Sequence, residues 1–409
     1  MRYRDYDPKV DKDPVYRILR EVGWAEPGGQ YSLDLTLEAA RALVAEVDGS
    51  PECIVCTAPG VMRYLEEDLP SVEVTLVATS RIARRQGLAS RLLAQALAAD
   101  VAEGAIAARV CAFDQGYYDK VGFGPGPYEH TVSFDPAALK LNVKPRTPRR
   151  LTKDDVQLIH ASRLARKRAH GGANYPSTAH TQIELDFAHK GFGLGYCDGP
   201  NGELTHHFWC SAQDAEQGPY RISWIAYQTG EQFLELMGLL QGLSDQVHLV
   251  RMREPYGIQL QDLLDRPTRR HSVTEGSRFE NRTAAHAYWN IRICDLAKCL
   301  ERTHLCCGEV RFNLRLTDPV ERLLDDSASW RGVAGEYVVT VGPSSHVELG
   351  ADPSLPTLAG SVNAFSRLWL GVRPATGLAI TADLSGPERL LQQLDRAFLL
   401  PQPRPDWDF

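Results

Sequence analysis

The sequence has no apolar run long enough to span a bilayer, and its first residues, MRYRDYDPKVDKD, are too charged for a signal peptide. It has no Walker-type lysine loop and no G-x-G-x-x-G turn, so nucleotide hydrolysis and hydride transfer find no support. It also has no excess of positive charge, because 52 acidic and 45 basic residues give a net charge of -7. We therefore expect no nucleic-acid partner and no membrane partner.

The cysteines show no pattern of a disulfide framework. There are nine, an odd number, and they are scattered along the chain, which indicates a reduced, cytoplasmic protein. Cys53 and Cys56 form a C-x-x-C in a segment that reads as a strand, where a spacing of three points the two thiols to opposite faces. Cys306 and Cys307 are adjacent to each other and near His304. We expect buried free thiols and no metal.

The length of 409 residues and a hydrophobic content of 43% predict two or three domains with real cores. The segment KLNVKPRTPRRLT reads as a linker, and RPTRRHSVTEGSRFENRTAA is polar enough to be a second boundary. The predicted domains are residues 1–143, 150–280 and 285–409.

The first domain reads as mixed α/β. Apolar spacing predicts helices over 13–22, 33–47 and 88–101, with strands at "CIVC", "SVEVTLVATS" and "AARVCAF". In the last domain the predicted strands are "EVRFNLRLTD", "GEYVVTVG", "SHVELG" and "GLAITADL", and the predicted helices are "VNAFSRLWLG" and "PERLLQQLDRAF". The fold class is therefore α/β (α+β) with mixed sheets.

The stretch RRQGLA lies between the strand "VTLVATS" and the helix that begins at Leu88. Helix N-termini expose unpaired N–H groups and a positive dipole end, so they bind phosphate. Gly87 allows close approach of the backbone, and Arg84 and Arg85 would add charged donors. The alternative is an ordinary basic turn at a strand–helix junction.

The order of strand, R-x-x-G-x-A, amphipathic helix, strand and Tyr-x-x-x-Gly-Phe resembles the GCN5-related N-acetyltransferases, across "VATSRIARRQGLASRLL" and "GYYDKVGFG". The resemblance implies acetyl-CoA as co-substrate, with the pantetheine arm beside a splay between strands near Val77 and Phe113. The residues that it implies for acetyl-CoA are Leu76, Val77, Thr79, Arg84, Arg85, Gln86, Gly87, Leu88, Ala89 and Phe113.

Acetyl transfer to an amine needs a base for the amine and benefits from an acid for the departing thiolate. Tyr118 stands where related enzymes carry a tyrosine near the sulfur, so it is the predicted acid, whereas Tyr117 should point elsewhere. Glu73 stands where many relatives place a glutamate that acts through water.

The whole chain further resembles the enhanced-intracellular-survival (Eis) acetyltransferases, which have tandem GCN5-related domains and a C-terminal domain similar to sterol carrier proteins. That resemblance rests on "LRLTDP", "VNAFSRLWLG" and the final "DF". It implies that the α-carboxylate of Phe409 is the catalytic base, and it implies a hexamer. Prolines in the last ten residues would stiffen the tail, and Trp407 would anchor it. Whether Phe409 or Glu73 is the base stays open.

The second domain has the strand–helix order, but it reads "AYQTGEQFLEL" where the cradle should stand. Glu231 would repel a phosphate there, so we expect one CoA per chain and a degenerate second copy.

The resemblance implies a small-molecule amine acceptor such as an aminoglycoside, a polyamine or a lysine side chain. Trp24, Glu26 and Asp408 are the predicted acceptor-binding residues. A non-catalytic scaffold that binds acyl-CoA or lipid is the alternative function.

Overall fold

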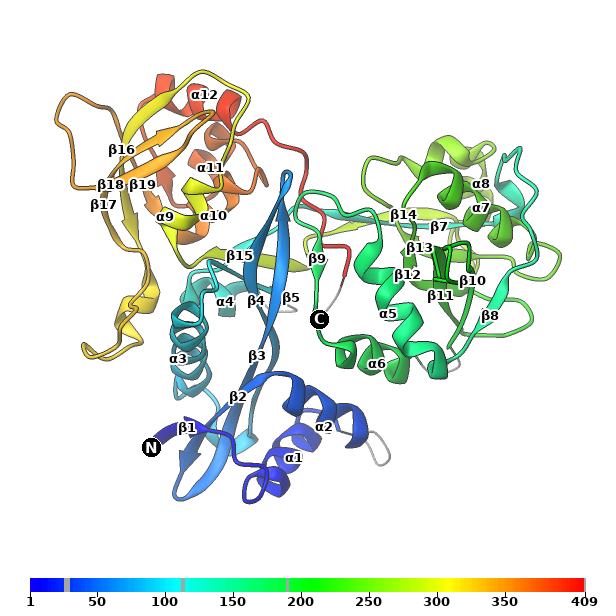
Figure 1. Cartoon of the computed structure of the whole chain (residues 1–409), viewed down its shortest axis with the longest axis horizontal. Coiled ribbons are helices and arrows are strands. Elements are labelled where there is room, and N and C mark those ends of the chain that lie inside the picture. The colour runs from blue at the N-terminus through cyan, green and yellow to red at the C-terminus, as the bar shows by residue number, and fades with distance from the viewer. Residues whose placement is uncertain (26–29, 112–114, 189–190, 408–409) are drawn as a thin grey trace. The chain divides into compact units, whose positions relative to one another are not determined.

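The structure, a computed structural model, describes residues 1–25, 30–111, 115–188 and 191–407 (Figure 1). The predicted site residues Glu26, Phe113, Asp408 and Phe409 lie outside the described residues. The chain forms two compact units. The first comprises Met1–Pro127, His170–Ala173 and Ala287–Phe409, and the second comprises Tyr128–Ala169 and Asn174–His286.

An eight-stranded sheet organises the first part of unit 1. Its strand order is β1 (Arg2–Asp5), β2 (Arg41–Val47), β3 (Ser50–Tyr64), β4 (Glu67–Thr79), β5 (Ala107–Cys111), β15 (Trp289–Ile293) and β6 (Gly124–Pro125), with β9 (Ala173–Asn174) beside β3. β4 and β5 run parallel, while the other neighbours along this path are antiparallel.

Helices cover both faces of this sheet. They are α1 (Lys12–Glu21), α2 (Gln30–Ala39), α3 (Leu88–Ala102) and α4 (Gln115–Tyr118), with 3₁₀ turns η1 (Arg81–Ala83) and η2 (Asp119–Val121). α3 buries Leu88, Leu92 and Leu97 against one face, and α1 buries Val15 and Ile18 against the other. The helix predicted over 88–101 is thus confirmed, and its apolar stripe faces the sheet.

The C-terminal part of unit 1 is a smaller α+β layer. Its five-stranded sheet has the order β18 (His346–Leu349), β17 (Gly335–Val341), β16 (Val310–Thr317), β19 (Thr357–Ser361) and β20 (Leu384–Ser385). Its helices are α9 (Leu296–Glu301), α10 (Val362–Trp369), α11 (Ala375–Thr381) and α12 (Glu388–Ala397), and a 3₁₀ turn is η6 (Pro319–Arg322).

The core of this layer continues into the N-terminal segment of the chain. Tyr64, at the end of β3, stacks on Trp369 with ring centroids 4.6 Å apart, and its hydroxyl donates to the Trp369 carbonyl at 3.1 Å. The Trp369 indole in turn donates to the Thr303 hydroxyl at 2.9 Å. The first and last thirds of the chain therefore share one hydrophobic core.

Unit 2 repeats the topology of the first sheet. Its order is β14 (Arg282–His286), β7 (Glu129–Phe134), β13 (Val250–Arg253), β12 (Tyr220–Ala226), β11 (His206–Ala212), β10 (Gly191–Tyr196) and β8 (Arg149–Leu151). Its helices are α5 (Val156–Ala165), α6 (Thr178–Phe187), α7 (Gly230–Gln241) and α8 (Pro267–Thr274), and its 3₁₀ turns are η3 (Pro136–Ala138), η4 (Lys153–Asp155) and η5 (Leu260–Leu263). The one parallel pair along this sheet, β12 and β13, flanks α7, just as β4 and β5 flank α3.

Each of the two large sheets contains a strand from outside the predicted domain that forms the rest of it. β7 belongs to the predicted first domain but lies in the second sheet, and β15 belongs to the predicted third domain but lies in the first sheet. The division into 1–143, 150–280 and 285–409 stays a prediction. It did not include the exchange of β7 and β15 between the two sheets. The predicted α/β (α+β) fold with mixed sheets is confirmed.

Two sequence-based elements are wrong. The helix predicted over 33–47 ends at Ala39, and 41–47 form β2, because Asp48 and Gly49 turn the chain back into β3 with φ angles of 52° and 83°. An Asp-Gly pair with two positive φ angles is the signature of a type I′ hairpin, which the alanine-rich segment obscured. The strand predicted at "GLAITADL" is mostly α11.

The two thiols of the C-x-x-C point to opposite faces, as predicted. Cys53 packs in the α3-side core and Cys56 in the α1-side core. Burial raises the pKa of Cys53 to about 11 and that of Cys56 to about 12, so both remain neutral thiols.

Replacing Trp369 by Ala should lower the free energy of unfolding by about 3–5 kcal/mol, because it empties the centre of the shared core. Hydrogen exchange measured by mass spectrometry should increase around Tyr64 as well as in 287–409. Ile380→Ala, at a side chain 85% exposed, is the control and should change little. Increased exchange confined to 287–409 would contradict a shared core.

Candidate active site

Among the described residues, β4 is paired with its parallel neighbour β5 only along its first half. The last pair of β4 with β5 joins Val74 to Val110, although β4 continues to Thr79. On its other side β4 stays paired with β3, but a bulge at Thr75 shifts the register between Val74 and Leu76. Bulges bend a strand and strengthen its twist. Among the described residues, the backbone from Thr75 to Thr79 therefore presents an edge with no β5 partner.

The bulge also exchanges the faces of the strand. Val72 and Val74 pack on the α3 side, whereas Leu76 and Ala78 pack on the α1 side and Val77 turns toward α3. This reversal follows from inserting one residue into an alternation of period two. The predicted residues Leu76, Val77 and Thr79 all lie on this open half of β4. Their predicted counterpart Phe113 lies outside the described residues.

A left-handed turn connects β4 to α3. Arg85 has a φ of 62°, and Gly87, the N-cap of α3, has a φ of 76°. Residues 84–87 are exposed, whereas Leu88 is buried and Ala89 packs partly against the core. A Cβ added at Gly87 would meet nothing within 4 Å, so the space beside the cap is open.

The N-terminus of α3 is uncapped among the described residues. Gly87 makes no side-chain cap, and the first turn of the helix contains no acidic residue. The first helical N–H groups and the positive end of the dipole are thus available to a ligand. The equivalent helix α7 differs, because Thr229 and Gln232 form a capping box and Glu231 lies in the first turn. Of these two helices, α3 alone offers an open anion-binding end.

Tyr118 is the last residue of α4, and the turn that follows it is fixed by contacts with the core. Its ring is 7% exposed and packs in the α3-side core with Leu88, Val74 and Val110. Gly122 has a φ of 87°, and a Cβ there would come within 2.2 Å of Arg292 Nη1, so the turn requires glycine.

Arg292 on β15 anchors that turn. Its guanidinium donates to the Val121 carbonyl and pairs with Asp318 at 2.5 Å, with both side chains fully buried. Tyr118 thus packs in the α3-side core, on the side of the sheet to which Val77 turns. The Tyr117 ring packs edge-on against that of Tyr118, with centroids 4.9 Å apart at an interplanar angle of 85°, and both rings contact the α3-side core. Burial raises the pKa of Tyr117.

Glu73 lies in a buried ion pair. Its Oε1 accepts from Arg109 Nε at 2.8 Å, from Arg109 Nη2 and from the Ser71 hydroxyl at 3.1 Å. Both charged side chains are 0% exposed. Burial raises the pKa of Glu73, while Arg109 and Ser71 lower it. The sequence-based analysis missed Arg109, although an arginine within the apolar strand "AARVCAF" is itself a sign of a buried partner.

The C-terminal tail lies against the segment 170–173. Arg404 N–H donates to the His170 carbonyl at 2.7 Å, and Ala173 N–H donates to Asp406 Oδ1 at 3.2 Å. Pro403, Pro405 and Trp407 are buried, with Trp407 only 1% exposed. The described part of the tail is therefore docked rather than frayed.

His170 ties this segment to unit 1 as a neutral side chain. Its Nδ1 accepts from Leu65 N–H at 3.0 Å, so the proton sits on Nε2, which donates to the Leu370 carbonyl at 3.0 Å. Burial lowers the pKa of His170 to about 4.

The remaining predicted residues are less informative. Trp24 is 42% exposed and follows α1, while Glu26, Asp408 and Phe409 lie outside the described residues. Among the described residues no three His, Cys, Asp or Glu side chains gather as metal ligands. Within the same ranges every helix is too short or too polar to cross a bilayer.

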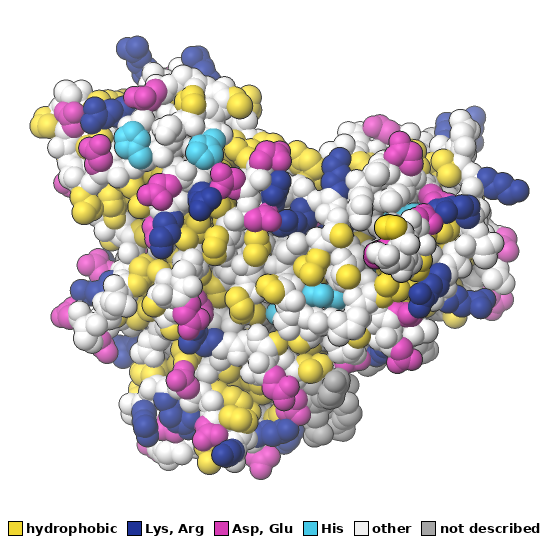
Figure 2. All heavy atoms as spheres, viewed as in Figure 1, with side chains coloured by type: hydrophobic (Ala, Val, Ile, Leu, Met, Phe, Trp, Pro, Cys, Tyr) yellow, Lys and Arg dark blue, Asp and Glu magenta, His cyan; other side chains and the backbone are white. Residues whose placement is uncertain are grey.

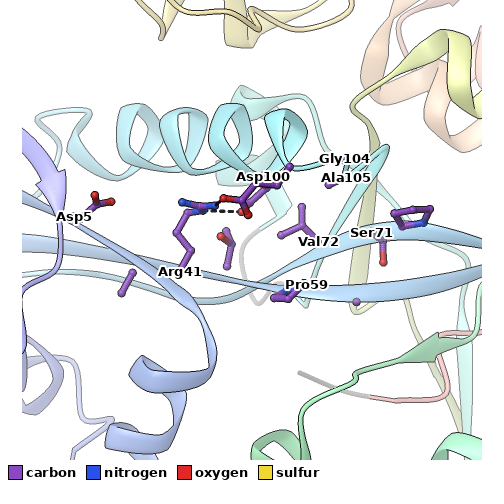
Figure 3. A pocket seen from close by; sticks show the side chains of 13 residues that line it. Asp5, Arg41, Pro59, Ser71, Val72, Asp100, Gly104 and Ala105 are labelled. Carbon is purple, nitrogen blue, oxygen red and sulfur yellow. Dashed lines mark hydrogen bonds and ion pairs between the residues drawn. The ribbon is translucent and has the colours of Figure 1, made fainter.

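A separate cavity of about 580 Å³ lies at the opposite end of α3 (Figure 3). It is lined by Arg41, Ser71, Val72, Asp100 and Gly104 among others, and Arg41 pairs with Asp100 at 2.8 Å. None of the predicted site residues lines it.

Comparison with solved structures identifies the fold. A probable N-acyltransferase from Enterococcus faecalis V583 is similar over 100% of this chain and 99% of its own, with a TM-score of 0.80 and 17% identity. Eis1 from Mycobacterium abscessus is similar over 100% of both chains, with a TM-score of 0.78 and 16% identity. A GCN5-related N-acetyltransferase from Anabaena variabilis covers 100% of both, with a TM-score of 0.79 and 14% identity.

No family model matches the sequence, and no curated protein matches it. At these identities the likeness concerns the fold alone. The chain thus has the tandem fold of GCN5-related N-acetyltransferases along its whole length.

The state of His170 gives a pH dependence with a definite sign. Its folded pKa of about 4 lies below the unfolded value of 6.5, so its contribution to stability is present above pH 6.5 and is lost as the pH falls toward 4. The loss should amount to about 3 kcal/mol. His170→Gln should remove this part of the slope in denaturant unfolding measured between pH 7 and pH 4. Parallel slopes for the variant and the wild type would contradict the neutral state of His170.

Proposed function

We propose that the chain is an acetyl-CoA-dependent N-acetyltransferase that transfers an acetyl group to a primary amine within a ternary complex. One observation carries this proposal. The half of β4 that has no β5 partner among the described residues is followed, after the turn 80–87, by the N-terminus of α3, so a backbone edge and a helix N-terminus follow one another along the chain. A pantetheine amide and a diphosphate need these two features in this order.

For acetyl-CoA, the backbone of 75–79 is the partner of the pantetheine arm. The N–H groups at the start of α3 hold the diphosphate. Arg84 and Arg85 are exposed beside that turn and add charged donors, while Gly87 lets the phosphates approach the backbone. The capped N-terminus of α7 supports one CoA per chain.

For the chemistry, the Phe409 α-carboxylate takes a proton from the acceptor ammonium, and the amine nitrogen then bonds to the thioester carbon. As the carbon–sulfur bond breaks, Tyr118 gives its hydroxyl proton to the CoA thiolate, and the second proton that the nitrogen loses restores the Tyr118 hydroxyl. The base role is supported by the docking of residues 403–407 in the same unit as β4 and Tyr118.

For the acceptor, we propose a small cationic amine, such as an aminoglycoside, a polyamine or a lysine side chain, bound by Trp24, Glu26 and Asp408. Figure 2 shows acidic and basic side chains interspersed on the visible face. A reduced, cytoplasmic setting, a hexameric assembly, a C-terminal layer related to sterol carrier proteins and the absence of nucleic-acid and membrane partners complete the proposal.

The double variant Arg84→Gln/Arg85→Gln should bind CoA about tenfold more weakly, because two exposed charge-assisted contacts are lost. Isothermal titration calorimetry measures this directly. Arg149→Gln/Arg150→Gln removes an adjacent exposed arginine pair from unit 2 and is the matched control. Equal weakening by both double variants would indicate a general charge effect and contradict the assignment.

Tyr118→Phe should lower kcat by roughly 100-fold, as expected for loss of a general acid, and leave CoA affinity unchanged. Thiol release from acetyl-CoA is the assay, with a panel of amines as acceptors. Unchanged turnover would remove the acid role from Tyr118. If the wild-type protein binds CoA but acetylates no amine in the panel, a non-catalytic acyl-CoA-binding scaffold becomes the better description.

A further inference from the structure

We propose that Glu73 and Arg109 are positioning residues that hold the C-terminal tail beside the point where the pairing of β4 with β5 ends among the described residues, and that Glu73 is not the catalytic base. This inference rests on the proposed function, because it assumes that the end of the tail takes part in the reaction. The tail-holding part, however, can be tested without any activity.

Glu73 and Arg109 are directly opposed in the register of β4 and β5, one position before the last pair, Val74 and Val110. Among the described residues, β4 and β5 have no pair beyond that one. The ion pair therefore lies beside the edge of β4 along which we place the pantetheine arm.

Burying the two charges of this pair has a desolvation cost. Both side chains are 0% exposed, and a buried ion pair is often no more stabilising than apolar side chains of the same volume. Stability alone thus gives little reason for charges at this point in the core. A further contact of Arg109 gives a reason for the charges. Its Nη1 donates to the Gly171 carbonyl at 3.2 Å.

Gly171 lies between Arg109 and the tail. Gly171 N–H donates to the Arg63 carbonyl, and Arg63 N–H donates to the Gly172 carbonyl, so this segment is clamped between β3 and Arg109. Gly171 has a φ of 81°, and a Cβ there would lie 2.7 Å from Pro403 Cβ and 2.9 Å from Arg404 N. The tail thus lies directly on the residue that Arg109 holds.

The same geometry argues against Glu73 as the base. Its Oε1 accepts from Arg109 and Ser71, and the whole side chain is enclosed. Because the Glu73 side chain is 0% exposed, an acceptor amine does not reach it directly, even though burial raises the pKa of its carboxyl.

The first experiment is digestion by carboxypeptidase Y, with release of Phe409 followed by mass spectrometry. Arg109→Met should release the residue at least about tenfold faster than the wild type, since cleavage follows the population of the undocked tail. Arg109→Lys, which keeps a donor, should lie in between. Arg292→Met removes an equally buried guanidinium of unit 1 and should digest like the wild type. Equal digestion of Arg109→Met and the wild type would overturn the proposal.

The second experiment separates positioning from proton transfer. Glu73→Gln keeps an oxygen for Arg109, so we expect kcat within about threefold of the wild type and an unchanged pH profile. A base would instead lose about 100-fold in kcat together with the acidic limb of the profile, and that result would overturn the proposal. In Arg109→Met, kcat should fall while KM for acetyl-CoA stays nearly constant.

The two failures can be told apart. If the wild type has no acetyltransferase activity but Arg109→Met still exposes the tail, the proposed function fails and the tail-holding role stands. If Arg109→Met does not fold, Gly171→Ala replaces it, because the new Cβ displaces Pro403 without touching the ion pair. Slow release of Phe409 from Gly171→Ala would then overturn the docking of the tail on Gly171.

Discussion

The proposed site depends on where the pairing of β4 with β5 ends, which among the described residues is at Val74 and Val110. A single extra residue, Thr75, bends β4 and leaves its last five residues with a free backbone edge on the β5 side among the described residues. The same bulge sends Val77 toward α3 and Leu76 toward α1. We propose that the pantetheine arm pairs with this edge.

Unit 2 repeats this topology, but the N-terminus of its equivalent helix differs from that of α3. β12, α7 and β13 reproduce β4, α3 and β5, but α7 satisfies its own N-terminus with a capping box and adds Glu231 to the first turn. A cap stabilises a helix by about 1 kcal/mol and removes its free donors at the same time. α3 keeps those donors open, at some cost in stability, because Gly87 cannot cap through a side chain.

Short sequence patterns predicted the parts of the proposed site that lie within one segment of the chain. The helix beginning at Leu88 and the turn at Gly87 follow from apolar periodicity and from a glycine at a strand–helix junction. The bulge at Thr75 has no such signal, since one inserted residue leaves an apolar strand apolar. The role of Arg109 depends on Gly171, 62 residues away, and tertiary pairing of that kind is invisible to periodicity. β2 was missed for a different reason, because an alanine-rich segment outweighed the Asp-Gly turn that follows it.

The most direct test of the central claim is a crystal structure with bound coenzyme A. The account predicts the pantetheine amides paired with the backbone of Thr75–Thr79 and the diphosphate on the N–H groups at the start of α3. Coenzyme A bound elsewhere, or a protein strand occupying the open edge of β4, would contradict it.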